Sequence, residues 1–198
     1  RMKQTNGVIS DAIPKGTVLF AKLDGFDEEC HKLNNCYCSV NLLNSLFSAF
    51  DLLCDEYQVT KIKSVQNVYI VACGMFGEQE HKTRIARIAI EMLRKLEEML
   101  PYFAPLLNMP QSFAMRIGIA SGPFSAGVLG TSKFLYDIFG DTVNVSSRMM
   151  STSEPGRIQL CGTNLSDELA NENFVVSERG VVNVKGKGEL QTFWLHSL

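Results

Sequence analysis

The stretch FLYDIFGDTVNVSSRMMSTSEP, residues 134–155, decides how the rest of this chain is interpreted. It places Asp137 ahead of a Gly-Asp turn, and Asn144 and Arg148 follow four residues apart. Because four residues make about one helical turn, the carboxamide and the guanidinium would share a face just inside a helix N-terminus. Free N–H groups, the helix dipole and the donor fork of an arginine together suit a bound phosphate.

The same stretch also fits an ordinary amphipathic helix. Val143, Val145 and Met149 would then face a core, while the polar residues between them face water. The local pattern leaves both interpretations open, and other parts of the chain have to decide between them.

Composition limits the classes of protein to which the chain can belong. Its 198 residues, 45% hydrophobic and 20% charged, are typical of one globular domain. A net charge of -2 lacks the basic surplus of a nucleic-acid-binding protein, so no nucleic-acid partner is expected. No apolar run approaches the roughly 20 residues of a membrane span. Six cysteines without a C-x-x-C pair indicate reduced thiols of a cytosolic domain, and the start at Arg1 favours an excised piece of a larger protein.

Hydrophobic periodicity predicts the order of the elements. Residues 1–15 are polar and mixed, and we expect them to form a flexible lead-in. Strands or short apolar segments are predicted at 16–21, 60–65, 68–73, 113–120, 125–129, 156–161, 174–176, 181–184 and 192–195. Helices are predicted at 27–57 in two parts, at 81–100, after residue 141 and at 164–170, with a proline-punctuated loop from Pro101. This order predicts an α+β fold: a ferredoxin-like (split βαβ) antiparallel sheet with helices on one side and a C-terminal extension.

Five segments, in this order, resemble the catalytic domain of class III nucleotidyl cyclases, the adenylyl and guanylyl cyclase family. They are VLFAKLDGF (18–26), KIKSVQNVYIVACG (61–74), RIGIASGPFSAGVLG (116–130), YDIFGDTVNVSSRMMSTSEPGRIQL (136–160) and VKGKGELQTFWL (184–195). The resemblance implies a class III cyclase fold and makes residues 16–198 a nucleotidyl cyclase homology domain. Such domains pair head to tail, and the active site lies in the cleft between them.

The resemblance also implies a reaction. Two magnesium ions held by two aspartates activate the ribose 3′-hydroxyl, which attacks the α-phosphate while pyrophosphate leaves. The negative charge that develops on the α-phosphate is offset by a preplaced arginine.

Two departures from the family pattern affect the metal site. The metal aspartates would be expected at Lys22 and Asn67, the latter after Gln66, where the family usually has glycine. A protonated lysine repels magnesium, and a neutral amide is a weaker ligand than a carboxylate. Asp24 would point to the same side of a strand as Lys22, but Lys22 would remain beside it. We therefore expect that this chain binds no catalytic metal and that Mg²⁺ or Mn²⁺ is supplied through a partner domain.

The substrate-binding residues of the family are matched. Lys63 and Asp137 match the pair that reads adenine in adenylyl cyclases, where guanylyl cyclases typically carry a glutamate and a cysteine or similar residue. Asn144 and Arg148 match the ribose-orienting asparagine and the transition-state arginine, and Lys185 matches a lysine that contacts the terminal phosphates. For the two lysines, a solvated strand edge and a solvated turn remain alternative interpretations.

This division of residues resembles the second, metal-free cytosolic half of membrane adenylyl cyclases. We therefore interpret the chain as the substrate-binding half of a dimeric cyclase that converts ATP to cyclic AMP and pyrophosphate with a metal-bearing partner domain, on the same or another chain. A homodimer of isolated copies would be nearly inert. A guanylyl cyclase half and an inactive regulatory pseudo-cyclase are the alternatives. The expected location is a cytosolic domain of a larger membrane-anchored protein.

Overall fold

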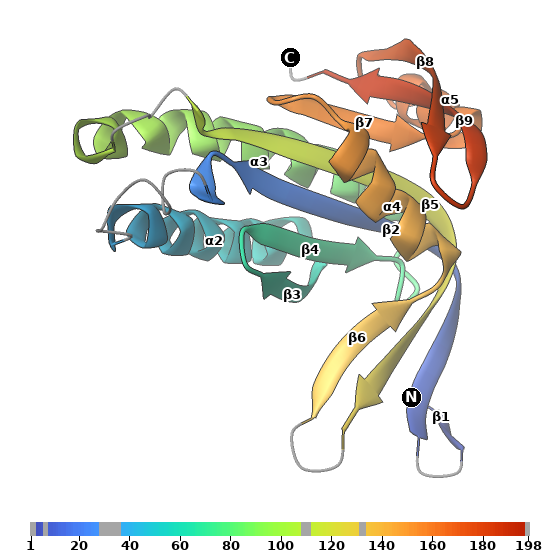
Figure 1. Cartoon of the computed structure of the whole chain (residues 1–198). Helices are drawn as coiled ribbons and strands as arrows, with labels where there is room; N and C mark the ends of the chain where they lie inside the picture. The colour runs from blue at the N-terminus through green and yellow to red at the C-terminus, as the bar shows by residue number, and fades with distance from the viewer. Residues whose placement is uncertain (1–2, 6–7, 28–36, 108–111, 131–133, 197–198) are drawn as a thin grey trace.

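The computed structural model describes residues 3–5, 8–27, 37–107, 112–130 and 134–196. One mixed sheet contains the strands of this part of the chain, and helices lie against both of its faces (Figure 1). The elements are β1 (Lys3–Thr5), β2 (Val8–Asp24), α2 (Tyr37–Tyr57), β3 (Thr60–Val65), β4 (Val68–Cys73), α3 (His81–Phe103), a 3₁₀ turn (Ala104–Leu106), β5 (Ala114–Leu129), β6 (Leu135–Phe139), α4 (Asp141–Thr152), β7 (Arg157–Cys161), α5 (Thr163–Asn171), β8 (Val176–Val184) and β9 (Gly188–Leu195).

The sheet has the strand order β3-β4-β2-β5-β7-β9-β8, with β1 paired to β2 and β6 paired to β5. Its neighbouring strands are antiparallel, apart from the parallel pair β5–β7. This confirms the predicted α+β fold and its antiparallel sheet. The first part of the helix predicted at 27–57 falls mostly outside the described residues, and α2 is its second part.

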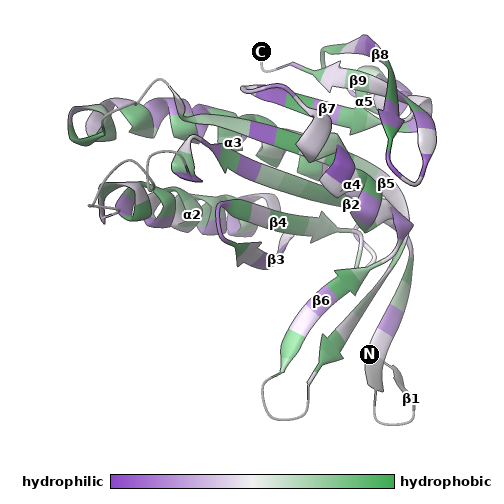
Figure 2. Cartoon of the chain, viewed as in Figure 1, coloured by the Kyte–Doolittle hydropathy of each residue, from purple (hydrophilic) through white to green (hydrophobic). Residues whose placement is uncertain are grey.

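Alternation along the central strands gives the sheet two packed faces. Leu19 and Ile117 lie in the main core with residues of α2, α3 and α5. Gly118 and Ala120, which alternate with the inward residues along the same strand as Ile117, lie on the opposite face, against α4. The predicted placement of helices on one side therefore holds for α2 and α3, whereas α4 covers the other face. In Figure 2 much of α4 is coloured hydrophilic, while β4 is coloured mostly hydrophobic.

Two long strands extend beyond the helices as an arm (Figure 1). β2 starts at Val8 rather than at Gly16, because Ile9–Ile13 pair with Phe124–Val128. The predicted boundary between residues 15 and 16 therefore lies inside β2. β5 (Ala114–Leu129) likewise runs on through residues 121–124, which separated the two segments predicted at 113–120 and 125–129. Pro123 is tolerated because the register shifts between Ile13 and Gly16, which leaves the proline out of the ladder where it could not donate.

Helix α3 continues past the proline at which the sequence predicted a loop. Pro101 lies inside the helix, in its last turn, where a missing N–H removes one intrahelical hydrogen bond. Met99, Leu100 and Phe103 pack against the main core and hold this last turn in place. No helix in the described part of the chain is long and apolar enough to cross a membrane.

Helix α4 approaches the sheet at a point without a side chain. A Cβ added to Gly118 would lie 2.0 Å from the Met150 nitrogen and 2.5 Å from the Ser146 carbonyl oxygen. The Ser146 hydroxyl donates to the Val18 carbonyl at 2.8 Å and also lies 3.0 Å from the Gly118 carbonyl. The helix backbone is thus fixed directly on two strands.

We predict that Gly118→Ala destabilises the protein by about 3 kcal/mol, because the methyl group has to push α4 off β5. The measurement is the urea midpoint of unfolding. Ser125→Ala, at an exposed position of the same strand, is the control and should change stability by less than about 0.5 kcal/mol. Equal midpoints for Gly118→Ala and the control would contradict the close approach.

Candidate nucleotide site

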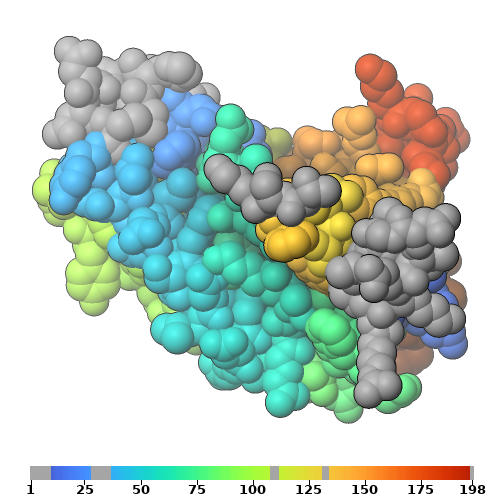
Figure 3. All heavy atoms as spheres, turned by 90° about the horizontal axis from the view of Figure 1, so that it is seen from below, coloured from blue at the N-terminus to red at the C-terminus, as the bar shows by residue number. Residues whose placement is uncertain are grey.

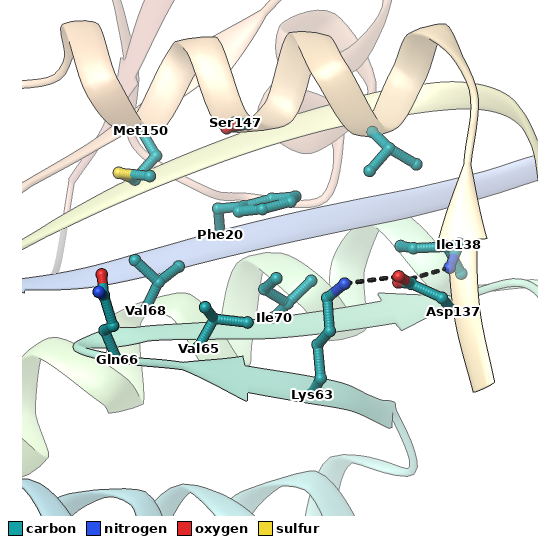
Figure 4. A pocket seen from close by; sticks show the side chains of 11 residues that line it. Phe20, Lys63, Val65, Gln66, Val68, Ile70, Asp137, Ile138, Ser147 and Met150 are labelled. Atoms are coloured by element: carbon teal, nitrogen blue, oxygen red, sulfur yellow. Dashed lines mark hydrogen bonds and ion pairs between the residues drawn. The ribbon is translucent and has the colours of Figure 1, made fainter. Parts of the chain in front are cut away.

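A cavity of about 310 Å³ lies between α4 and the sheet. Phe20, Val68 and Ile70 of β2 and β4 form an apolar floor, and α4 contributes Val143 and Met150 as the opposite wall (Figure 4). The remaining lining residues are Lys63, Val65, Gln66, Asp137, Ile138 and Ser147. In the space-filling view of Figure 3 the surface is hollowed between the teal β3–β4 part of the chain and the orange-to-red C-terminal part.

The two predicted base-reading residues meet in this cavity. The ammonium group of Lys63, on β3, donates to Asp137 Oδ2, on β6, at 2.5 Å, although 74 residues separate them in the sequence (Figure 4). The other carboxylate oxygen accepts the Ile138 N–H at 2.9 Å. Side-chain exposures of 29% and 13% place a mostly buried charge pair in a largely apolar cavity. Such a pair offers one cationic donor and one anionic acceptor to a flat heterocycle.

The strand that carries Lys63 is fastened to α2. Lys61 Nζ donates to both carboxylate oxygens of Asp51 on α2, at 2.6 and 2.8 Å. The hydroxyl of fully buried Tyr69 donates to the same carboxylate. Cys54 lies 3.6 Å from that hydroxyl, and burial raises the pKa of its thiol to about 11. This cluster fixes the β3–β4 hairpin and thereby the backbone position from which the Lys63 side chain extends.

Asn144 and Arg148 lie together on α4, as their spacing predicted, but not in the cavity. Both are exposed on the outward face of the helix. Ser147, beside Arg148 in the sequence, does line the cavity. The Arg148 guanidinium has no ion pair or hydrogen bond within the described part of the chain. The backbone carbonyl of Arg148 accepts from the hydroxyls of Ser151 and Thr152. Asn144 and Arg148 therefore face solvent rather than the interior of the cavity.

The predicted phosphate lysine lies in a turn beside α4. Lys185 is exposed in the β8–β9 turn, and the preceding Val184 packs against Val145 and Met149. A second lysine of this turn, Lys187, forms an ion pair with Asp141, the first residue of α4. Sequence reasoning missed Lys187, because the K-G-K-G sequence of residues 185–188 gives no signal that separates its two lysines.

Two arginines from distant strands hold the C-terminal end of α4. Arg116 donates to the Ser153 carbonyl at 3.0 Å, and Arg179 donates to the Thr152 carbonyl at 2.7 Å. Arg179 also stacks on Trp194, 4.5 Å from the ring centre, and burial lowers its pKa. Cations at a helix C-terminus bind the free carbonyls and oppose the negative end of the dipole. Neither arginine had a sequence signal, since each acts through a tertiary contact.

The two positions expected to hold metal ligands are engaged in other contacts. Lys22 Nζ lies 3.9 Å from Asp24, and Arg116 Nε donates to the other oxygen of that carboxylate. Asn67 is 3% exposed. Its side-chain amide donates to the Leu23 carbonyl at 2.8 Å, and its backbone carbonyl accepts the Leu23 N–H at 2.9 Å. Within the described ranges, no group of three or more His, Cys, Asp or Glu side chains is arranged to hold a metal ion.

Comparison with known proteins identifies the family. The family model described as adenylate and guanylate cyclase catalytic domain matches residues 8–197. The chain belongs to this cyclase family. The resemblance seen in the sequence is thereby confirmed, and so is the class III cyclase fold.

Curated relatives include both kinds of cyclase. An adenylate cyclase of Mycobacterium tuberculosis is 36% identical over 202 residues, which cover 98% of this chain and 42% of that protein. A membrane guanylyl cyclase of Dictyostelium discoideum is 35% identical over 189 residues, which cover 95% of this chain and 12% of that protein. The chain thus spans less than half the length of these relatives.

Solved structures give the same result. The guanylate cyclase domain of a Catenaria anguillulae protein in complex with GTP superposes with a TM-score of 0.83 at 26% identity, covering 94% of this chain and 98% of that chain. The catalytic core of a rhodopsin-guanylyl cyclase with converted specificity, in complex with ATPαS, gives a TM-score of 0.80 at 29% identity, covering 96% and 98%. An adenylyl cyclase from P. aeruginosa, at 23% identity, shares the fold with a TM-score of 0.87 and covers 96% of each chain.

Proposed function

We propose that this domain is the substrate-binding, metal-ligand-lacking half of a dimeric cyclase that converts ATP to cyclic AMP and pyrophosphate. The observation that carries the proposal is the pairing of Lys63 with Asp137 inside an apolar cavity. In the reaction, the 3′-hydroxyl loses its proton to water and its oxygen forms a bond to the α-phosphorus. The bond from that phosphorus to the bridging oxygen breaks, and pyrophosphate leaves with the electron pair.

The charge pair supports adenine as the base. When adenine enters, the Lys63 ammonium donates to ring N1, which is an acceptor, and Asp137 accepts from the exocyclic amine. Guanine presents an N–H and a carbonyl at the same edge. The Lys63 ammonium would then face another donor, and the Asp137 carboxylate would face another acceptor. The apolar floor around the pair excludes water, which strengthens the discrimination.

The residues at the expected metal positions do not fit a magnesium ion. Lys22 brings a positive charge, and Asp24 is already shared between two cations. The Asn67 side chain is turned into the fold, where its amide bonds to Leu23. Magnesium prefers carboxylate and water oxygens in an octahedral arrangement, which this corner does not offer. The proposal therefore assigns Mg²⁺ or Mn²⁺ to carboxylates of the partner domain.

The placement of Asn144 and Arg148 supports a composite site. Both are exposed on α4, where a facing domain would form a cleft with them. Lys185 is exposed in the turn beside the same helix. A facing cyclase domain would complete this cleft. A homodimer would place base-reading groups in both clefts and metal-binding carboxylates in neither.

Two alternatives rest on specific observations. Guanylyl cyclases among the relatives, and the neighbour bound to GTP, favour a guanylyl cyclase half that makes cyclic GMP. The altered metal positions would equally suit an inactive regulatory pseudo-cyclase. Asn144 and Arg148 favour the enzyme half, because a domain outside turnover has no chemical need for this pair. The membrane guanylyl cyclase among the relatives is consistent with a cytosolic domain of a larger membrane-anchored protein.

We predict that the isolated domain shows little cyclase activity with Mg²⁺ or Mn²⁺, and that mixing it with a metal-bearing cyclase half restores turnover. The measurement is cyclic AMP and cyclic GMP formation with ATP and GTP side by side. Strong activity from this chain alone would refute the assignment of metal to the partner, and inactivity with every competent partner half would favour the pseudo-cyclase.

In the reconstituted enzyme, Arg148→Ala should lower kcat by about two to three orders of magnitude with a smaller effect on KM, because the lost donor acts on charge that develops in the transition state. Arg94→Ala is the matched control. Arg94 is exposed on α3, on the other face of the sheet, where it pairs with Glu91. An unchanged kcat for Arg148→Ala would remove this arginine from the mechanism.

The pair Lys63→Glu with Asp137→Cys should move the preference of the reconstituted enzyme from ATP toward GTP, because it reverses the donors and acceptors at the base edge. The readout is the ratio of kcat/KM for the two nucleotides. Lys63→Glu alone should lower kcat/KM for ATP, but it should raise kcat/KM for GTP less than the double change does. If the ratio is the same before and after the double change, these residues do not read the base.

A further inference from the structure

The exposed residues of α4 form one stripe along the helix. They are Asp141, Asn144, Arg148 and Ser151, whereas the other residues of this helix are buried or half-buried. Spacings of three, four and three residues place these side chains on the same face. The stripe therefore holds the proposed ribose and α-phosphate residues together with one carboxylate, that of Asp141.

This carboxylate is placed where it would act against a bound triphosphate. Asp141 is the first residue of α4, one turn before Asn144, and its side chain is 62% exposed. A carboxylate at a helix N-terminus is favoured by the helix dipole. The same carboxylate repels phosphate at the end of the helix that would otherwise attract it. A nucleotide site on this face therefore requires that the charge of Asp141 be offset.

Lys187 offsets this charge from the β8–β9 turn, which lies beside the start of α4 (Figure 1). Its ammonium group forms an ion pair with Asp141 Oδ1. The backbone N–H of Lys187 donates to the Val184 carbonyl at 2.9 Å and closes the turn. Val184 is 1% exposed and packs against Val145 and Met149 of α4. The turn that carries the ammonium group is thus seated on the same helix as the carboxylate.

The two lysines of this turn have different contacts. Lys185 is exposed and forms no ion pair within the part of the chain that the structure describes, whereas Lys187 is paired with Asp141. Gly186 separates them with a φ of 81°, a left-handed conformation that glycine adopts without strain. Lys185 therefore remains available to phosphate, and the charge of Lys187 is engaged by the helix.

We propose that Lys187 is a positioning residue of the nucleotide site, which neutralises Asp141 and so keeps the exposed stripe of α4 from repelling the triphosphate. Lys187 acts through Asp141 and not through contact with the nucleotide. With the pair formed, these two charges cancel, and those of Arg148 and Lys185 remain to attract phosphate. This inference rests on the proposed nucleotide site.

The test measures the binding of ATP and of adenosine to the chain by calorimetric titration. Lys187→Met should weaken ATP binding about three- to tenfold at low salt, because it leaves the Asp141 carboxylate unpaired near the triphosphate. Adenosine has no phosphate, so its affinity should stay the same. The loss for ATP should become smaller at high salt, which screens exposed charges.

A second change at Asp141 separates neutralisation from direct phosphate binding. Asp141→Asn in the Lys187→Met background should restore the ATP affinity, because the double change removes both charges. Asp141→Asn alone should bind ATP at least as tightly as the unchanged chain, and Lys187→Arg should keep the affinity because it keeps the charge. Lys95→Met is the matched control, since Lys95 pairs with Glu98 on α3, on the other face of the sheet. It should change neither affinity.

Two outcomes would overturn the inference. One is a loss of ATP affinity in Lys187→Met that Asp141→Asn does not restore, because Lys187 would then bind phosphate itself or only hold the turn. The other is an equal loss for ATP and adenosine, which would indicate a general structural role.

Lys63→Met separates this inference from the proposed function, because it should weaken the binding of ATP and adenosine alike. If it does so while Lys187→Met leaves ATP binding unchanged, only the role of Lys187 is wrong. If Lys63→Met changes neither affinity, or the unchanged chain binds neither compound, the nucleotide site itself is wrong and the inference fails with it.

Discussion

The contact on which the site depends is the direct packing of α4 on β5 at Gly118. With no Cβ between helix and strand, Ser146 reaches carbonyls of two strands and fixes the rotation of the helix. That rotation turns Val143, Ser147 and Met150 toward the cavity. The residues between them, including the asparagine and arginine of the family motif, then have to face outward. One backbone contact therefore decides which residues of α4 line the cavity and which are exposed to solvent.

Both ends of α4 are held by residues far away in the sequence. Near its start, Thr142 donates to the Pro123 carbonyl at 2.7 Å. At its end, Arg116 and Arg179 bind the last carbonyls. Arg116 also binds Asp24, next to one of the expected metal positions. Arg116 thus joins Asp24 to the C-terminal end of α4, and this shared guanidinium couples the two regions electrostatically.

The sequence predicted those elements whose signal is local. The apolar spacing of α2 and α3 and the two-residue hairpin turn need no distant partner to be recognised. The predicted lengths of β2 and β5 were wrong, because the outer halves of these two strands pair with each other across more than 100 residues of sequence, beyond Pro123. In the site, Lys63 and Asp137 came from the family resemblance, since no periodicity connects strands that far apart. Arg116, Arg179 and Lys187 had no signal at all, because their roles arise only when α4 is seated on the sheet.

Residue 67 is an asparagine where the family pattern has an aspartate, and this difference lies inside the fold rather than on its surface. Its amide donates to the Leu23 carbonyl from a position that is 3% exposed. A carboxylate in the same rotamer would place two acceptors against each other and bury a charge, so it would have to turn outward toward solvent. In this hairpin the amide is thus part of the fold, because its hydrogen bond to Leu23 holds the β3–β4 turn against β2. A carboxylate at residue 67 would therefore also remove a contact that fixes the hairpin from which Lys63 enters the cavity.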